Sequence, residues 1–264
     1  MAFTDAPGFR MYYEEHGAGF PLLFINGLGG DHVEWLHQVP VFSQRFRTIA
    51  FDNRGAGDSE TPKGPYSTGQ MADDAAALLS AMGIGRAHVI GASLGGMIAQ
   101  ELALRHSEMV SRLVLACTSP GGEGSVRPSS VALAAFVRTH DGDRESELRR
   151  MIPYLYSELC RRKRPGEIEE FIARRLSRPG SPEGYAAQLA AAVDHSAWER
   201  LGGIGVPTLV ITGGDDRLVP PVNSERISER IPGAKLVVLP GRPHRLFAED
   251  PDAFNREVLV FLPQ

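Results

Sequence analysis

The first 118 residues alternate short apolar runs with longer stretches in which apolar residues recur at helical spacing. This alternation is typical of a mostly parallel sheet that helices cover on both faces. The run Met-Tyr-Tyr-Glu at residues 11–14 predicts an antiparallel edge strand. We expect the remaining strands at residues 21–25, 47–51, 87–91, 112–116, 208–212 and 235–239.

Helices are expected in the stretches between these strands. Residues 67–82 and 94–106 each place apolar side chains three and four positions apart, which predicts one buried face per helix. The last helix is predicted to begin after Asp250, because an aspartate can cap the first turn and Pro251 suits the first helical position.

The pattern changes at the Ser-Pro-Gly-Gly turn of residues 119–122. From there to about residue 201 the chain predicts short helices separated by Gly and Pro, without a strand. We therefore predict a helical cap at residues 120–201, inserted into an α/β core made of residues 1–119 and 202–264. The length of 264 residues fits one large α/β domain with such an insertion.

Composition and charge exclude several classes of protein. The chain has 28 basic and 32 acidic residues, so its net charge of −4 provides no field that would favour nucleic acid or an anionic membrane. Cys117 and Cys160 have neither the number of a disulfide framework nor the spacing of a zinc site. Because no signal peptide and no run of 18 apolar residues occurs, we expect a cytoplasmic protein without a membrane segment.

The strongest local signal is the sequence Gly-Ala-Ser-Leu-Gly at residues 91–95, which fits G-x-S-x-G between a predicted strand and a predicted helix. A serine on such a sharp turn needs glycines two residues away, since only glycine leaves room for the close backbone approach. The turn would project Ser93 above the carboxyl end of the sheet as a nucleophile. A helix-capping serine is the simpler alternative, and the predicted strand and helix on either side of the motif weigh against it.

A serine nucleophile needs a general base. His244 lies in the loop after the last predicted strand, at the edge of the sheet where Ser93 is also expected. We therefore predict that His244 is the base. The other histidines are interpreted as surface or structural residues: His16, His32, His37, His88, His106, His140 and His195.

The base in turn needs a carboxylate that orients it. The strand at 208–212 runs into Gly-Gly-Asp-Asp, so Asp215 and Asp216 both lie at the correct edge of the sheet. The chain order Ser, Asp, His fits either residue, and the pattern of residues alone leaves both open.

Together these residues resemble the α/β-hydrolase superfamily, from about residue 21 to residue 262. The family places its acid in a pattern D-x-x-x-P, which begins here at Asp216 and ends at Pro220, so the resemblance favours Asp216 over Asp215. The Asn-Gly-Leu-Gly-Gly sequence at residues 26–30 is similar to the family's loop after its third strand. The resemblance implies that the backbone N–H groups of Leu28 and Leu94 form an oxyanion hole.

A narrower resemblance points to the 3-oxoadipate enol-lactonases. It rests on residues 26–29 with Trp35 downstream, on Gly-Pro-Tyr at 64–66 and on Leu-Gly-Gly-Met at 94–97. Asn26 replaces the histidine that is commoner in the superfamily. The simplest interpretation is that its side chain binds the loop backbone, and the sequence does not assign it a further role. The segment at residues 52–59 matches another family pattern, D-x-R-G-x-G-x-S, and is interpreted as a structural loop.

These features predict a serine hydrolase of the esterase or lactonase type, acting on a small carboxylic ester or lactone without a metal or organic cofactor. The alternatives are a hydrolase of C–C bonds in ring-cleavage diketones, which similar family members cleave with the same triad, and a ligand-binding relative with a silent triad. Substrate choice is expected to depend on cap side chains, for which the aromatic candidates are Phe136, Tyr154, Phe171 and Trp198.

Overall fold

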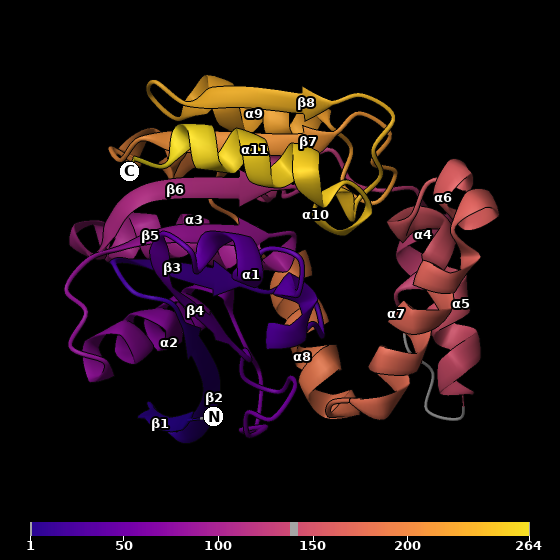
Figure 1. Cartoon of the computed structure of the whole chain (residues 1–264), viewed down its shortest axis with the longest axis horizontal. Helices are drawn as coiled ribbons and strands as arrows, with labels where there is room; N and C mark the ends of the chain where they lie inside the picture. The colour runs from indigo at the N-terminus through magenta and orange to yellow at the C-terminus, as the bar shows by residue number, and fades with distance from the viewer. Residues whose placement is uncertain (1, 138–141, 264) are drawn as a thin grey trace.

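The computed structural model describes residues 2–137 and 142–263 and contains a central sheet of eight strands (Figure 1). Neighbouring strands follow the order β1-β2-β4-β3-β5-β6-β7-β8, in which the first two pairings are antiparallel and the rest are parallel. The carboxyl ends of the parallel strands therefore meet at one edge. The strands are β1 (Ala2–Ala6), β2 (Phe9–His16), β3 (Phe20–Ile25), β4 (Phe46–Phe51), β5 (Ala87–Ala92), β6 (Val110–Ala116), β7 (Thr208–Gly213) and β8 (Lys235–Leu239).

All seven predicted strands are present, and the predicted α/β fold is confirmed. One detail is wrong: residues 11–14 belong to β2, which is antiparallel as expected but is not an edge strand, because β1 pairs along its outer side. The sequence analysis missed β1 because Phe3 is its one large apolar side chain and is half exposed. A short strand that buries little has almost no period-2 signal.

Helices cover both faces of the sheet, as the alternation predicts. The first face carries α2 (Thr68–Ala81), α3 (Leu94–Arg105) and α9 (Val222–Arg230), whose apolar residues pack with Leu23 and Ile25 of β3. The second face carries α1 (Val39–Phe42), α10 (Leu246–Glu249) and α11 (Pro251–Phe261), which pack with Leu22 and Phe24 of the same strand. Successive strand residues point to opposite faces, so one strand serves both cores.

The predicted helix cap at Asp250 is present, and a second capping residue occurs at Ser67. The Asp250 carboxylate accepts a hydrogen bond from the N–H of Ala253 in the first turn of α11, which begins at Pro251 as expected. Ser67 likewise caps α2 by accepting from the N–H of Gln70. The sequence analysis did not predict α9, because its nine residues are mostly polar and only one large apolar side chain, Ile227, is buried.

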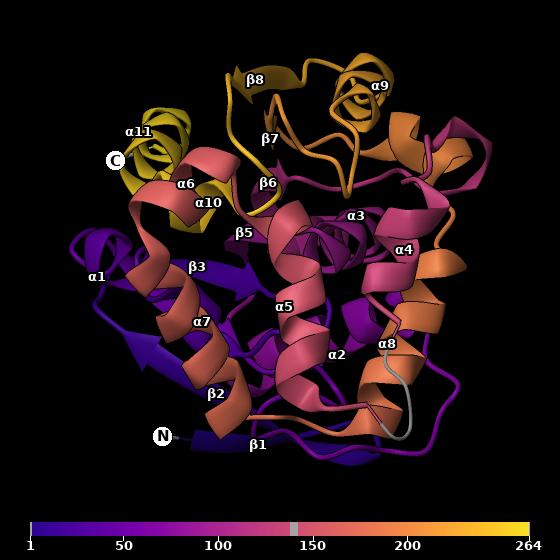
Figure 2. The same ribbon diagram turned by 90° about the vertical axis from the view of Figure 1, so that its right-hand side faces the viewer.

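Among the described residues, five α-helices follow β6 and precede β7, where the sequence predicts an insertion without strands; we call them the cap helices. Four of them, α4 to α7, lie over the edge formed by the carboxyl ends of the parallel strands, at the right of Figure 1 and toward the viewer in Figure 2, whereas α8 lies at the lower centre of Figure 1. Phe136 and residues of α5, α6 and α7 form a small apolar cluster of their own. The predicted limits at residues 120 and 201 stay predictions. The cap helices are α4 (Ser130–Ala135), α5 (Arg144–Leu155), α6 (Glu158–Lys163), α7 (Pro165–Ser177) and α8 (Pro182–Val193).

Short 3-10 helices complete the described chain. Among the described residues, no helix is both long and apolar enough to cross a membrane. The 3-10 helices are η1 (His32–Trp35), η2 (Ser107–Met109), η3 (Gly122–Gly124) and η4 (Trp198–Gly203).

Candidate active site

Ser93 occupies the sharp turn between β5 and α3. Its φ of 57° and ψ of −121° lie in a region that a residue with a Cβ rarely adopts, and holding such a conformation costs about 1–3 kcal/mol. Hydrogen bonds fix the turn on both sides: the N–H of Ser93 donates to the carbonyl of Ala116 at 2.9 Å, and its carbonyl accepts from Oγ1 of Thr118 at 2.7 Å. The serine is therefore held in one backbone conformation.

The two glycines of the motif are required because other backbone segments pass too close to them to leave room for a side chain. A Cβ on Gly91 would lie 2.2 Å from the carbonyl oxygen of Gly95, and a Cβ on Gly95 would lie 2.1 Å from that of Ile25. Both separations are far below a van der Waals contact, so the turn fits only where both positions lack a side chain. The structure supports the predicted reason for glycine at these positions.

His244 and Asp216 form a buried hydrogen-bonded pair at the same edge of the sheet. The distance between Nδ1 of His244 and Oδ2 of Asp216 is 2.7 Å. The other carboxylate oxygen of Asp216 accepts from the N–H groups of Leu218 and Val219 at 2.9 and 2.8 Å. Because an ionised carboxylate only accepts hydrogen bonds, Nδ1 of His244 carries the proton and Nε2 is left to accept one. Asp215 is exposed to solvent, so it is Asp216 that contacts the histidine.

A cavity of about 440 Å³ brings four of the five predicted site residues together. Ser93, His244, Leu28 and Leu94 all line it, while Asp216 is buried behind His244. Most of the lining is apolar, which is typical of sites for small organic ligands.

The cap helices contribute part of the cavity wall. Of the four aromatic candidates, Phe136 and Phe171 line the cavity. Tyr154 packs edge to face on Phe136, and the ring of Trp198 lies under the guanidinium of Arg230. The latter two side chains thus have packing roles within the described structure.

The loop that carries Leu28 runs directly past the serine. A Cβ on Gly27 would lie 3.3 Å from Cβ of Ser93, so the backbone of this loop and the nucleophile turn are in contact. Asn26 donates from Nδ2 to the carbonyl of Phe51 at 2.9 Å. The asparagine side chain thus binds the backbone of β4 and not that of its own loop, which differs from the simplest interpretation of the sequence.

A buried cluster of charges lies on the wall of the same cavity, and the sequence analysis did not predict it. Glu34 forms an ion pair with Arg245, and Nη1 of Arg175 lies 3.6 Å from its other carboxylate oxygen. Burial alone would raise the pKa of Glu34, but the charges of Arg245 and Arg175 outweigh it and lower that pKa to about 2. Glu34 is therefore ionised at neutral pH. The Nε of Arg245 also donates to the hydroxyl of Tyr156 at 3.1 Å.

His195 is a second lining residue that the sequence analysis interpreted as structural. Its ring nitrogens lie 3.0 Å from Oγ1 of Thr68 and 3.5 Å from Oε1 of Gln100. Burial lowers the pKa of His195 to about 4, so the imidazole is neutral at pH 7. These contacts agree with a structural histidine on the cavity wall. The predicted surface or structural residue His140 lies outside the described residues.

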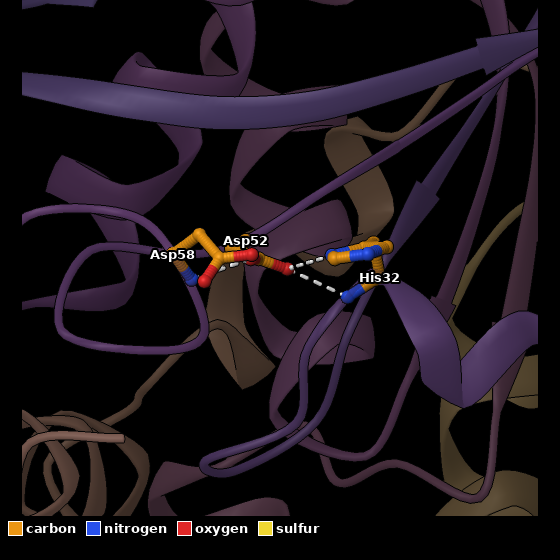
Figure 3. Close-up of side chains that lie close together, drawn as sticks. All are labelled: His32, Asp52 and Asp58. Carbon is orange, nitrogen blue, oxygen red and sulfur yellow. Dashed lines mark hydrogen bonds and ion pairs between the residues drawn. The ribbon is translucent and has the colours of Figure 1, made fainter. Parts of the chain in front are cut away.

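The segment at residues 52–59 has a structural arrangement, as expected. Figure 3 shows the Asp52 carboxylate between His32 and Asp58: it accepts from the N–H and Nδ1 of His32 at 2.6 and 2.9 Å, and from the N–H of Asp58 at 2.8 Å. His32, Asp52 and Asp58 each provide one atom of a type that can bind a metal ion, and these three atoms lie within 4.8 Å of one another. Arg178, which follows α7, forms ion pairs with Asp58 and Asp31 at 2.5 and 2.7 Å. The group therefore ties two loops and a cap helix together.

Comparison with known proteins agrees with this architecture. A family profile described as "alpha/beta hydrolase fold" matches residues 21–251, and the chain belongs to this family of hydrolases. It is 32% identical to a putative carbamate hydrolase of Azorhizobium caulinodans, over 99% of this chain and 98% of that protein. It is also 32% identical to 3-oxoadipate enol-lactonase 2 of Acinetobacter baylyi, over 90% and 86% of the two chains.

Among solved structures, the enol-lactonase from Burkholderia xenovorans LB400 superposes with a TM-score of 0.90 at 27% identity, over the full length of both chains. The predicted resemblance to the superfamily and to its enol-lactonases is thereby confirmed. The names of these relatives describe the substrates of those proteins.

The glycine contacts of the nucleophile turn lead to a stability prediction. We expect Gly95→Ala to lower the free energy of unfolding by at least about 2 kcal/mol, because its Cβ would overlap the Ile25 carbonyl, and the backbone of α3 or of β3 would have to move. Gly85→Ala is the control, since a Cβ there has nothing within 4 Å. Urea unfolding of both variants tests this, and an unchanged Gly95→Ala midpoint would contradict the close packing.

The pKa of His195 leads to a pH prediction. In the unfolded chain an imidazole protonates near pH 6.5, whereas folded His195 protonates near pH 4, so between these values the unfolded state binds more protons and stability falls as the pH falls. At pH 5 the difference in proton binding lowers the free energy of unfolding by about 2 kcal/mol. We expect His195→Gln to lose less stability than the parent between pH 7 and pH 5. His88, whose pKa is also lowered to about 4 by burial, is unchanged in both proteins and cancels in the comparison. Equal losses in urea titrations at the two pH values would refute this.

Proposed function

We propose that the protein hydrolyses a small carboxylic ester or lactone with a Ser93–His244–Asp216 triad, through an acyl-enzyme. The observation that carries the proposal is the buried hydrogen bond between His244 and Asp216, because it leaves Nε2 of His244 available to a cavity that Ser93 also lines. A base that is oriented by a fixed carboxylate, next to a serine on a strained turn, is the arrangement that acyl transfer requires.

In the first step His244 takes the proton of the Ser93 hydroxyl while the serine oxygen attacks the carbonyl carbon. Asp216 stabilises the imidazolium that forms, and the two N–H groups bound to its other oxygen hold the carboxylate in place. His244 then returns the proton to the leaving alkoxide. In the second step the same histidine activates water, which releases the acid and restores the serine.

The oxyanion hole is assigned to the N–H groups of Leu28 and Leu94. Leu94 follows the serine at the beginning of α3, where the helix N-terminus adds positive potential. The contact between Gly27 and Ser93 supports a position for the Leu28 loop close to the reacting carbonyl. Removal of one such donor typically costs about 10²–10³ in rate.

The substrate class follows from the cavity and from the relatives. A cavity of about 440 Å³ with mostly apolar walls suits a small acyl compound. The relatives named an enol-lactonase and a putative carbamate hydrolase support acyl compounds as the first substrates to assay. Lactones and esters share the carbonyl chemistry of the proposed steps.

The nucleophile and the base are tested together. We expect Ser93→Ala and His244→Ala each to lower kcat for a 4-nitrophenyl ester by at least about a thousandfold, and the double variant to be scarcely worse, because members of one catalytic unit are not additive. Thermal melts of each variant control for unfolding. Losses that multiply in the double variant, or turnover of a vinylogous diketone in place of every ester and lactone, would contradict the proposal.

The acid is tested by exchanging each of the two adjacent aspartates for asparagine. Asp216→Asn should lower kcat by at least about a hundredfold, since an amide beside Nδ1 stabilises the wrong tautomer of His244. Asp215→Asn is the matched control: Asp215 is exposed, so we expect less than about a threefold change. Activity is measured on the same ester, with melting temperatures for both. The reverse order of effects would assign the acid to Asp215.

A further inference from the structure

The buried glutamine Gln188 joins the cap to two loops of the core. It belongs to α8, which lies at the lower centre of Figure 1, apart from α4 to α7, and its side chain is fully buried. Its Oε1 accepts a hydrogen bond from the N–H of Gly29 at 2.8 Å, and its Nε2 donates to the carbonyl of Arg54 at 2.8 Å. Because an N–H needs an acceptor and a carbonyl needs a donor, these two partners fix the orientation of the amide.

Gly29 belongs to the loop that carries one of the proposed oxyanion donors, the N–H of Leu28. Its φ of 59° lies in the left-handed region, which favours glycine. The N–H of Gly30 donates to the carbonyl of Gly27 at 3.0 Å, which closes a tight turn over residues 27–30. The peptide bond between Gly27 and Leu28 joins that carbonyl to the Leu28 N–H, and in a planar trans peptide the two groups point in opposite directions. The direction of the Leu28 N–H therefore depends on this turn.

Gln188 holds the part of this turn that the internal hydrogen bond leaves free. The common turn types I and II share the same closing bond and differ mainly in the orientation of the middle peptide. Here the middle peptide joins Leu28 to Gly29, and its N–H is the group that Gln188 binds. Without this bond the middle peptide can rotate, and the backbone of Leu28 moves with it.

Close packing of α8 against the core keeps Gln188 in place. Gly184 and Tyr185 lie four and three residues before Gln188, on the same face of the helix. A Cβ on Gly184 would lie 2.3 Å from the carbonyl oxygen of Gly55. A Cβ on Gly29 would lie 2.6 Å from Cδ2 of Tyr185. The helix thus contacts core backbone at two further points, so the glutamine amide has little freedom to follow a shift of the turn.

Gln188 lies outside the cavity in which the proposed reaction takes place. The described residues that line this cavity include Leu189, its neighbour in α8, but not Gln188. Its effect on the reaction must therefore pass through the N–H of Gly29. Misplacement of a group by about 1 Å can cost about a hundredfold in rate, even where the residue that causes it never touches the substrate.

We propose that Gln188 is a positioning residue for the oxyanion hole: by binding the N–H of Gly29 it holds the turn so that the N–H of Leu28 points at the developing oxyanion. This inference rests on the proposed function, because it requires acyl transfer at Ser93. A cap helix thereby completes the geometry of a core loop. The effect is confined to the transition states and the tetrahedral intermediate, since only there does the carbonyl oxygen carry the charge that the donor stabilises.

The first test removes both hydrogen bonds with an unbranched side chain of similar length. For Gln188→Met we expect kcat for a 4-nitrophenyl ester to fall at least about tenfold while KM changes less than about threefold, because an interaction made only in the transition state is lost. Arg164→Gln is the matched control, since Arg164 also bonds cap to core, but through the carbonyl of Glu249 in α10. Its kcat should change less than about threefold. Melting temperatures of both variants control for unfolding.

An inhibitor that resembles the tetrahedral intermediate separates positioning from a general loosening of the cap. The Ser93 oxygen adds to the carbonyl carbon of trifluoromethyl pentyl ketone, the serine proton passes to His244, and the carbonyl oxygen becomes an oxyanion in the hole. For Gln188→Met we expect the inhibition constant of this ketone to rise at least about tenfold. The inhibition constant of methyl pentyl ketone, which forms such an adduct far less readily, should change less than about threefold.

Gln188→Glu is the conservative variant, and it decides the question if Gln188→Met does not fold. A protonated carboxyl group can accept from Gly29 and donate to Arg54 as the amide does, whereas a carboxylate can only accept. Burial raises the pKa of a carboxyl group, so the ratio of the variant's kcat to that of the unmodified protein should rise as the pH falls from about 8 to about 6. If neither variant folds, deuterium exchange of the unmodified protein is measured: the Gly29 amide should exchange at least about a hundredfold more slowly than an unstructured amide.

The outcomes separate this inference from the proposed function. If a folded Gln188→Met keeps its kcat, changes KM alone or weakens both ketones equally, the positioning role is wrong while the esterase proposal stands. A pH-independent kcat ratio for Gln188→Glu, or exchange of the Gly29 amide at the rate of an unstructured amide, would overturn the positioning role as well. If Ser93→Ala hydrolyses the ester as fast as the unmodified protein, the proposed function itself fails, and this inference fails with it.

Discussion

The close contact of backbone around Gly95 is the constraint on which the candidate site depends. At this residue the beginning of α3 touches the end of β3, with no room for a single methyl group between them. The same contact sets the position of Ser93 relative to residues 26–29, because these residues continue directly from β3. Sheet, nucleophile turn and neighbouring loop therefore form one rigid unit, and the strained backbone of Ser93 is held by the packing around it.

The parts of this arrangement that could be predicted from the sequence are those that have a local signal. Strands and helices of the sheet other than β1 and α9 follow from apolar periodicity, and Ser93 follows from five consecutive residues with a glycine at each end. His244 and the pair Asp215–Asp216 could be placed by topology alone, since loops after parallel strands meet at one edge. The choice between the two aspartates needed a family pattern. In the structure Asp216 is buried and Asp215 is exposed, and this difference arises only from tertiary packing.

The charged cluster had no such signal. Glu34 lies in η1, Arg175 in the last turn of α7 and Arg245 beside the base, so three distant segments meet in one wall of the cavity. Each residue alone has the sequence appearance of an ordinary surface charge. These three residues are removed from solvent only when the cap helices pack against the sheet. In this buried setting the charges interact strongly, and one carboxylate faces two guanidinium groups.

The hydrogen bonds of Arg245 connect the cap to the loop of the base. Its backbone N–H donates to the carbonyl of Leu155 at the end of α5, and its side chain binds Tyr156, the next residue of the cap. Because Arg245 follows His244 directly, the end of α5 supports the segment that holds the imidazole. The cap therefore cannot be exchanged freely for the cap of a relative. In such a chimaera the new cap would have to provide a carbonyl at the position of Leu155 and a phenol at the position of Tyr156. Without these two groups, the loop that carries His244 would lose its support from the cap.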